Sequence, residues 1–487
     1  MELTLDRETG PLTARIAAAI DRRIDTGALA TGEKLPSVRR LATRLGVSPF
    51  TVVAAYDRLV AEGRIVARAK SGFFVAPRAT GRGANLSLDP LPSRRIGINP
   101  IWMMRQSLTA GPGQPKPGCG WLPPDWLPDS AIRTALRAIV REDGRNPALG
   151  NLVEYGVPLG FRPLRDLLAR RLNELEIPAE PDRLLLTDSA SQAIDLVCRY
   201  LVSPGDGVLV DDPGYFNFHA AVRAQRGKCI PVPMTPTGPD LDALDRLATA
   251  QRPKLYLTNA GPQNPTGARL GLNAAHKLLS LAQRHDFRIL EDDIFRDFET
   301  QPGFRLAALD GLARVIHLGS FSKTLSAATR IGFLAADPAT MADLADLKLA
   351  ISFGNNELSA RVIHRLLSDG SYRKHVAGMR DRLARCRHHV LKRLTGLGLM
   401  PWMDGAREPA EGLFLWMALP SNKSALAVAE AAQSAGIILA PGNVFSPGEE
   451  SRWDSFLRFN VAQSIDPQTH ATLKTVLGHA GARLHKL

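Results

Sequence analysis

The chain has 487 residues, of which 45% are hydrophobic and 22% charged, and its formal net charge is +13. This length exceeds what a single hydrophobic core supports, so we expect a small domain joined to a larger one, or three lobes. No run of about 18 apolar residues occurs, and the N-terminal residues do not have the pattern of a signal peptide. A membrane protein and a secreted protein are therefore not predicted, and a cytoplasmic location is expected.

The basic charge is concentrated near the N-terminus. Residues 1–78 carry 13 Lys and Arg residues against 8 Asp and Glu residues. Such a balance favours a polyanionic partner. The four cysteines lie far apart and form no Cys-x-x-Cys pair, so neither a zinc site nor a disulfide framework is predicted.

The first residues predict three helices. Residues 12–27 have apolar side chains at helical spacing and end at a glycine. Ser37 is the expected N-cap of a second helix, and Ser48 is the expected N-cap of a third, with Pro49 at its first position. Two short helices joined by a tight turn form a helix-turn-helix.

The next segment, GRIVARAKSGFFVAP, alternates apolar and polar residues around Lys-Ser-Gly and predicts a hairpin. Its turn carries Arg68 and Lys70. A basic hairpin beside a helix-turn-helix is a wing, which can contact phosphates or the minor groove while the last helix enters the major groove. From the pattern alone, a small helical dimerisation domain remains the alternative.

The motif LPSVRRLATRLGVS, followed by TV, AYDRLVAEG and SGFFV, closely resembles the GntR-type winged helix. The resemblance implies that residues 1–78 bind double-stranded operator DNA. The family usually has Arg where this chain has Pro49, so a common DNA contact is missing. With the two wing residues, the expected DNA-binding residues are Ser37, Arg39, Ser48, Thr51, Arg68, Lys70 and Gly72.

Residues 79–114 are predicted to be a linker and an arm. Residues 79–100 are rich in Gly, Pro, Ser and Arg and show little periodicity, which is typical of a linker. The proline-rich stretch that follows, as far as residue 128, is expected to be irregular. It leads into a second domain, residues 115–487, with a large lobe at about 150–350 and a small lobe at about 351–487.

In the second domain, helical patterns alternate with short apolar runs, which predicts an α/β fold with a mainly parallel central sheet. Ligands of such sheets bind where strands end and helices begin. The apolar runs are residues 183–187, 207–212, 254–258, 287–293, 314–320 and 330–336.

Polar residues follow several of these runs. The segment Ser189–Ser191 opens a helix whose N–H groups can hold a phosphate. A buried strand ends in three carboxylates at Glu291–Asp293, which is costly unless some face a cation. Lys323 follows another strand. Each feature alone also fits an ordinary structural role, such as a helix cap or a solvated lysine.

Together these features match a pyridoxal phosphate site and no metal site. The cofactor needs a lysine for its Schiff base, an aspartate beside its ring nitrogen and a cradle for its phosphate. Residues from about 115 to 480 resemble the fold type I aminotransferases, and the whole chain resembles the MocR subfamily of GntR regulators. The motifs that carry this resemblance are YGVPLGFRPLRDLLARRL, NPTG, EDDIF and SFSKTL followed by RIGF.

The resemblance implies a role for individual residues. Lys323 is the Schiff-base lysine, and Asp292 is the partner of the ring nitrogen. Asn264 bonds the ring oxygen, Tyr215 stacks on the ring, and Arg458 pairs with a substrate or effector carboxylate. Ser189, Ala190, Ser191, Ser320, Ser322 and Arg330 lie at or near the phosphate, which Tyr155 reaches across a dimer interface.

Two positions depart from the family pattern. Phe295 replaces the usual tyrosine after EDDI, which removes a hydroxyl that commonly bonds the ring oxygen. The usual glycine of the phosphate turn is replaced within DSASQA. The first change weakens the case for efficient turnover more than the case for cofactor binding.

The sequence therefore predicts a homodimeric transcriptional regulator whose aminotransferase-like domain binds pyridoxal phosphate and senses the cofactor, an amine or an amino acid. One alternative is a catalytically active aminotransferase with a DNA-binding appendage. Another is a regulator that has lost cofactor binding and uses its large domain only to dimerise.

Overall fold

The computed structural model describes residues 11–68, 71–77, 100–111, 113–142, 155–300, 303–402, 412–420, 423–448 and 451–482. The chain divides near residue 95 into two compact units, which we describe separately. Lys70, at the predicted tip of the wing, and most of the predicted linker lie outside the described residues.

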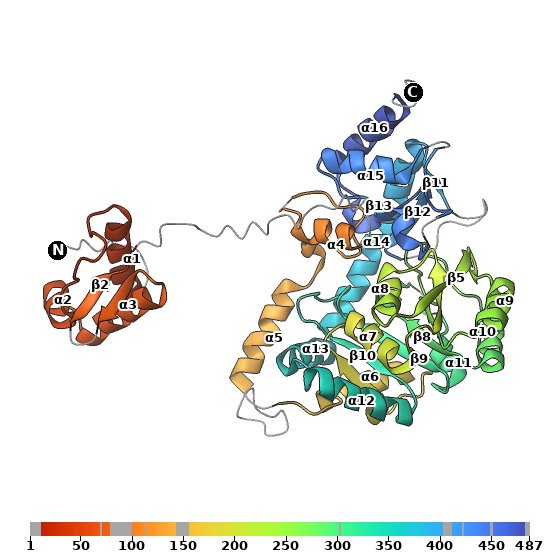
Figure 1. Ribbon diagram of the computed structural model, residues 1–487, viewed down its shortest axis with the longest axis horizontal. Helices are drawn as coiled ribbons and strands as arrows, with labels where there is room; N and C mark the ends of the chain where they lie inside the picture. The colour runs from red at the N-terminus through yellow and green to blue at the C-terminus, as the bar shows by residue number, and fades with distance from the viewer. Residues whose placement is uncertain are drawn as a thin grey trace. The chain divides into compact units, whose positions relative to one another are not determined.

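The first unit is the predicted winged helix. The predicted caps are confirmed, because the Ser37 hydroxyl accepts a hydrogen bond from the Arg40 N–H at 3.4 Å and the Ser48 hydroxyl accepts one from the Thr51 N–H at 3.1 Å. Buried apolar residues of all three helices and of the hairpin form one core around Tyr56. The elements, of which the three helices and β2 are labelled in Figure 1, are α1 Leu12–Asp25, α2 Val38–Leu45, α3 Pro49–Ala61, β1 Ile65–Arg68 and β2 Gly72–Val75.

The large lobe of the second unit is built on an eight-stranded sheet with the order β3-β10-β9-β8-β7-β4-β5-β6. Strands β9, β8, β7, β4 and β5 run parallel to one another, whereas β10 and β6 are antiparallel to their neighbours. All six predicted apolar runs contain strands of this sheet. Its strands are β3 Leu184–Thr187, β4 Gly207–Asp212, β5 Lys228–Thr235, β6 Gly238–Pro239, β7 Leu255–Thr258, β8 Arg288–Asp292, β9 Val315–Ser320 and β10 Gly332–Ala335.

Helices cover both faces of this sheet, so the mainly parallel strands are buried on both sides, as their continuous apolar sequences require. Side chains of α7, α8 and α12 pack on one face, and side chains of α6, α9, α10 and α11 pack on the other. These helices are α6 Arg162–Asn173, α7 Ala190–Leu201, α8 Phe216–Ala224, α9 Leu241–Gln251, α10 Leu272–His285, α11 Leu306–Asp310 and α12 Pro338–Ser352.

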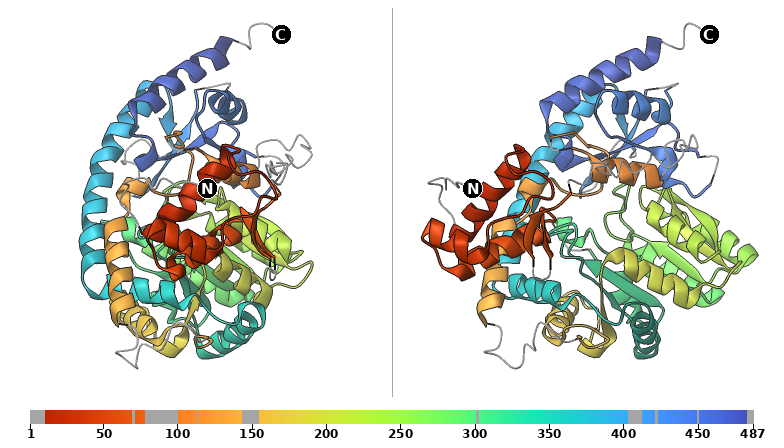
Figure 2. Two further views of the ribbon diagram at one scale, coloured as in Figure 1. Left: turned by 90° about the vertical axis from the view of Figure 1, so that its left-hand side faces the viewer. Right: turned by 60° about the vertical axis from the view of Figure 1, so that its left-hand side comes forward.

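The small lobe has an antiparallel sheet with the order β11-β12-β14-β13. Helix α14 is 26 residues long and runs along the outside of the unit from one lobe to the other (Figure 2). The remaining elements are α5 Asp129–Glu142, α13 Glu357–Ser368, α14 Ser371–Gly396, α15 Ala425–Ser434, α16 Pro467–Ala482, β11 Met400–Pro401, β12 Phe414–Ala418, β13 Ala440–Pro441 and β14 Phe456–Asn460, with short 3-10 turns η1 Pro124–Trp126, η3 Pro181–Arg183, η4 Arg296–Phe298, η5 Gly442–Phe445 and η6 Val461–Gln463.

One helix lies in the region predicted to be linker and arm. Residues Pro100–Thr109 form α4, whose Met103 and Ser107 are buried (Figure 1). The following arm is irregular, as predicted, and hydrogen-bonds to the small lobe: the Gly118 N–H donates to the Ile438 carbonyl at 2.9 Å, and the Ile438 N–H donates to the Pro115 carbonyl at 3.1 Å. The arm is therefore attached to the small lobe by backbone hydrogen bonds.

Candidate cofactor site and nucleic-acid interface

Lys323 lies in the turn between β9 and β10, at a narrow cavity of about 60 Å³. Burial lowers the pKa of Lys323 to about 8, and the nearby Arg458 adds to this effect. A substantial fraction of the side chain is then the neutral amine near pH 8, which is the form that attacks a carbonyl. The cavity is lined by Met103, Met104, Ser107, Cys119, Gly120, Trp121, Tyr215, Phe216, Asn264, Ile294, Phe295, Lys323 and Arg458.

Asp292 is the last residue of β8, and only one of its two carboxylate oxygens has a hydrogen-bond partner among the described residues. Its Oδ1 accepts a hydrogen bond from the Ile294 N–H at 3.2 Å, whereas its buried Oδ2 has no partner among the described residues. Burial raises the pKa of Asp292 to about 7, and Asp293 contributes in the same direction. A buried carboxylate oxygen without a donor fits the protonated ring nitrogen of pyridoxal phosphate, which would supply one.

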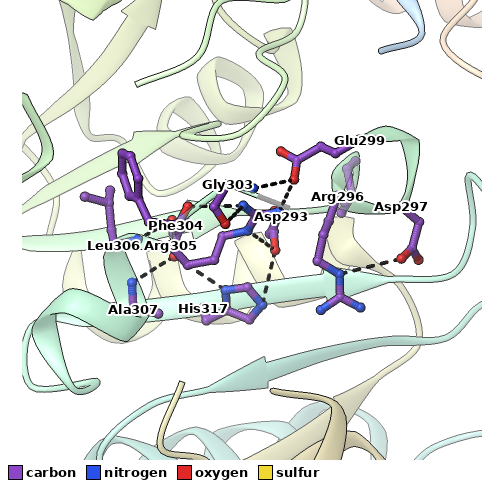
Figure 3. A network of polar contacts seen from close by, with 12 residues as sticks. Asp293, Arg296, Asp297, Glu299, Gly303, Phe304, Arg305, Leu306, Ala307 and His317 are labelled. Carbon is purple, nitrogen blue, oxygen red and sulfur yellow. Dashed lines mark hydrogen bonds and ion pairs between the residues drawn. The ribbon is translucent and has the colours of Figure 1, made fainter. Parts of the chain in front are cut away.

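The two other carboxylates at this strand end have different partners (Figure 3). Asp293 pairs with Nε of the buried Arg305 at 2.8 Å, and Glu299 pairs with Nη2 of the same guanidinium at 2.9 Å. Glu291 accepts hydrogen bonds from the N–H groups of Leu306 and Ala307 at the start of α11. Asp293 therefore faces a cation through its Oδ2, as its burial requires, although its buried Oδ1, like the Asp292 Oδ2, has no partner among the described residues. Asp292 thus has an oxygen that can accept a bond from a ligand.

Arg458 on β14 is 1% exposed and already has two partners. Its Nη1 donates to the Asn264 Oδ1 at 2.7 Å, and its Nη2 donates to the Gly118 carbonyl at 2.6 Å. Because the Asn264 oxygen is occupied, its amide nitrogen is left to donate, and its expected bond to a ring oxygen stays a prediction. A ligand carboxylate can pair with Arg458 only by competing with these bonds or by using its Nε, which has no partner among the described residues.

Tyr215 and Phe295 also line the cavity. The Tyr215 hydroxyl accepts a hydrogen bond from the Asn217 side chain at 2.7 Å, which orients the ring. Phe295 packs edge-on against Phe414, with ring centroids 5.2 Å apart. The predicted departure from the family pattern thus places an apolar ring where a hydroxyl is usual.

Three predicted phosphate residues line a second, wider cavity of about 790 Å³: Tyr155, Ser189 and Arg330. Gly332 allows the start of β10 to lie close to the start of α7, since a Cβ at this position would lie 2.8 Å from the Ala190 nitrogen. Tyr155 is 87% exposed and lines this cavity of its own chain, so the expected contact across a dimer interface stays a prediction.

The other predicted phosphate residues have local roles in the structure. The Ser320 hydroxyl donates to the Ile331 carbonyl at 2.9 Å and lies 3.1 Å from the Ser322 hydroxyl, so these serines brace the turn that carries Lys323. Ala190 and Ser191 form the first turn of α7, whose N-cap Ser189 accepts a hydrogen bond from the Gln192 N–H.

In the winged helix, those predicted DNA-binding residues that the structure describes lie at the start of α2, at the start of α3 and on the strands β1 and β2. Arg39 is exposed on α2. The Thr51 and Ser48 hydroxyls hydrogen-bond to each other at 2.8 Å, so both are held at the start of α3. Arg68 lies over the Phe74 ring at 4.6 Å, and Gly72 has a φ of 103°, which favours glycine at the wing.

Comparison with known proteins agrees with both parts of this picture. The gntR family model of bacterial regulatory proteins matches residues 12–75, and the model for class I and II aminotransferases matches residues 127–476. The HTH-type transcriptional regulator YdcR of Escherichia coli K12 is 28% identical, covering 92% of this chain and 94% of YdcR. The HTH-type transcriptional regulator YisV of Bacillus subtilis 168 is 30% identical and covers 85% of each chain.

The chain belongs to the MocR-type family.

A solved structure supports the fold of this MocR-type chain. LysN, an alpha-aminoadipate aminotransferase from Thermus thermophilus crystallised with N-(5'-phosphopyridoxyl)-L-leucine, aligns with a TM-score of 0.69 and 28% identity. The match covers 78% of the MocR-type chain and 95% of LysN. The family match and this fold confirm the predicted fold type I aminotransferase architecture.

Several residues of the MocR-type site were not foreseen from the sequence. Cys119 and Gly120 come from the arm, and Met103, Met104 and Ser107 come from α4, yet all five line the cavity of Lys323. Their only sequence signal is the apolar stretch IWMM and the small residues of GCG. Neither pattern says which cavity the segment enters.

The recognition helix of this MocR-type protein also carries an unforeseen residue. Phe50 is 85% exposed on the first turn of α3, where a recognition helix contacts base edges. Its position outside the buried stripe of that helix was the available signal. Among the described residues, no cluster of potential metal ligands occurs, and no helix is long and apolar enough to cross a membrane.

Proposed function

We propose that this chain is a transcriptional regulator that binds operator DNA through its winged helix and binds pyridoxal phosphate through Lys323. Its aminotransferase-like unit senses the cofactor or an amino compound. The regulator names of the relatives YdcR and YisV and the matched GntR domain support the first part. The lowered pKa of Lys323, the raised pKa of Asp292 and the unpartnered Asp292 oxygen support the second part.

The observation that carries the sensing role is the wall of the Lys323 cavity. Met103, Met104 and Ser107 line it from α4, which is the first helix after the winged helix among the described residues. A ligand that is larger than this cavity of about 60 Å³ displaces its lining residues. The chain segment that connects the winged helix to the second unit therefore leads into an element that such a ligand contacts.

Pyridoxal phosphate, when bound, supplies an electrophilic carbonyl and a ring that withdraws electrons. Lys323 would hold it covalently, Asp292 would keep a proton at its ring nitrogen, and the start of α7 with Arg330 would face its phosphate. Asn264, oriented by Arg458, would donate to its ring oxygen. A homodimer would present two winged helices to two half-sites of DNA.

A catalytic aminotransferase is the second candidate, because Lys323, Asp292 and Asn264 lie together as that reaction requires. Phe295 and the engaged guanidinium of Arg458 favour the regulator. Gel-shift titrations of the upstream DNA with and without pyridoxal phosphate and amino acids test this choice. Ligand-dependent DNA binding without steady turnover of an amino donor and a keto acid is the expected result, whereas steady turnover with ligand-independent DNA binding would favour the enzyme.

The α4 contact gives a prediction for signalling. We expect the Met103→Ala/Met104→Ala variant to keep cofactor binding but to lose most of the ligand-induced change in DNA affinity, because its cavity wall transmits less displacement. Absorbance and gel-shift titrations on one preparation measure both quantities. Met400→Ala, at an exposed methionine of the small lobe, is the control. An unchanged ligand response in the α4 variant would exclude α4 as the transmitting element.

The winged helix gives a second prediction. We expect Arg39→Ala to weaken binding to upstream DNA by roughly 1–3 kcal/mol if the guanidinium contacts a base, and to lower the salt dependence if it contacts a phosphate.

We expect Phe50→Ala to reduce discrimination between specific and random DNA, since an apolar side chain reads thymine methyl groups. Arg58→Ala is the control, because Arg58 pairs with Glu62 at the far end of α3. Fluorescence anisotropy across a salt series measures each effect, and equal losses in all three variants would contradict these roles.

A further inference from the structure

A second group of cations surrounds a cavity of about 330 Å³ between the end of α6 and the start of α14. Four arginines line it, against two carboxylates, so its lining carries a net positive charge. Its volume lies in the range of small-molecule sites. The arginines are Arg171, Arg296, Arg373 and Arg380, and the carboxylates are Glu174 and Asp297.

Two of the four guanidinium groups of this cavity have unused hydrogen-bonding capacity, whereas the Arg380 Nε donates to the Asp297 carbonyl at 2.8 Å. The buried Nε of Arg171 has no hydrogen-bond partner among the described residues, and its guanidinium lies over the Tyr372 ring at 5.2 Å. Arg296 reaches Asp297 only at 3.7 Å, which exceeds a hydrogen bond (Figure 3). Donors of buried guanidinium groups are costly when left unpaired, so these groups suit a ligand that brings acceptors.

The cations around this cavity lower the pKa of its carboxylate Asp297. Burial acts to raise the pKa of Asp297, yet Arg296, the Tyr372 hydroxyl, Arg171 and Arg380 together hold it below its ordinary value. Asp297 therefore stays ionised and does not neutralise all four cations.

This cavity is connected to the turn that carries Lys323. The hydroxyl of the buried Tyr372 donates to Asp297 and lies 2.9 Å from the Thr324 hydroxyl. His375 on α14 contacts the Thr324 carbonyl at 2.7 Å. Thr324 directly follows Lys323. A ligand that binds Arg296 or Arg171 therefore changes the surroundings of Asp297, and the Tyr372 hydroxyl links Asp297 to Thr324 in the lysine turn.

We propose that this cavity is a second anion site, which takes a small phosphate-bearing molecule and is coupled to the Lys323 turn through Tyr372. Guanidinium groups pair with phosphate oxygens in planar, two-point contacts, and several of them in one cavity favour a multivalent oxyanion over a single carboxylate. The site is separate from the predicted cofactor phosphate cradle at Ser189 and Arg330, with which it shares no lining residue.

Calorimetric titration of the full chain with pyrophosphate tests the site and requires neither cofactor nor DNA. The Arg171→Gln/Arg373→Gln variant is expected to weaken binding at least tenfold. Arg133→Gln/Arg162→Gln removes two exposed surface cations and matches the change in net charge. Arg330→Gln removes the cation of the cofactor cradle. Both controls are expected to retain binding, and circular dichroism checks that each variant is folded.

Hydrogen exchange of residues 321–325 tests the coupling. Pyrophosphate is expected to slow exchange there in the wild-type chain and not in Tyr372→Phe, which keeps the arginines but lacks the hydroxyl. Unchanged pyrophosphate affinity in Arg171→Gln/Arg373→Gln, or an equal loss in either control, would overturn the site. Tight binding without a change in exchange at residues 321–325 would overturn the coupling.

Discussion

Replacing Lys323 with alanine is expected to abolish the covalent attachment of pyridoxal phosphate. Lys323 presents its amine to the cavity, and burial lowers its pKa to about 8, so the reactive neutral form is available near neutral pH. The variant is expected to show no visible absorbance band with the cofactor and no change in DNA affinity on adding amines. Borohydride reduction followed by peptide mass spectrometry locates the adduct independently of any activity.

Two further variants make this result specific. Lys323→Arg keeps the charge but lacks the reactive amine, so it is expected to behave like the alanine variant. Lys348→Met removes another buried lysine whose pKa is lowered to about 8 by burial, but its Nζ donates to the Pro158 carbonyl at 2.9 Å. It is expected to keep the adduct. An adduct that persists in Lys323→Ala would disprove the assignment.

The second large effect concerns the stability of the cofactor-free protein. Burial raises the pKa of Asp292 from 3.8 to about 7, so the folded state binds its proton more tightly than the unfolded state. This group contributes stability below pH 3.8 and loses it as the pH rises to 7. At about 1.4 kcal/mol per pKa unit, the loss above pH 7 is on the order of 4 kcal/mol.

Asp292→Asn is therefore expected to raise the Tm of the cofactor-free chain by several degrees at pH 8, and by less at pH 5, while weakening cofactor binding. Asp293→Asn is the contrasting variant, because it breaks the buried pair with Arg305 and is expected to destabilise the fold by about 3 kcal/mol at pH 8. Calorimetric melting at the two pH values gives both quantities. A lower Tm for Asp292→Asn at pH 8 would show that its carboxylate is stabilised in the cofactor-free fold.

The sheet of the large lobe was predictable because its strands are continuous apolar runs flanked by polar ends. Once they are aligned in parallel, the ends of β8 and β9 bring Asp292 and Lys323 to one edge, which is why their proximity also followed from the sequence. Strands such as β11 and β13, of two residues each, leave no periodic signal to recognise.

The parts of the site that the sequence did not predict depend on contacts between distant segments. The bond between Arg458 and Asn264 joins residues 194 positions apart, and no local pattern indicates that one partner occupies the other. Helix α4 was missed because it follows a stretch rich in glycine and proline and has only ten residues. The three carboxylates at the end of β8 look alike in sequence, and only their neighbours distinguish Asp292 from Asp293.

The attachment of the arm to the small lobe has a mechanical consequence. Residues 115–118 share backbone hydrogen bonds with Ile438 and Asn460, so we expect the arm to follow the small lobe in any movement of that lobe. Any rotation of the small lobe on the large one then carries the end of α4 with it. A change in the angle between the lobes therefore becomes a displacement of the point from which the chain leads back to the winged helix.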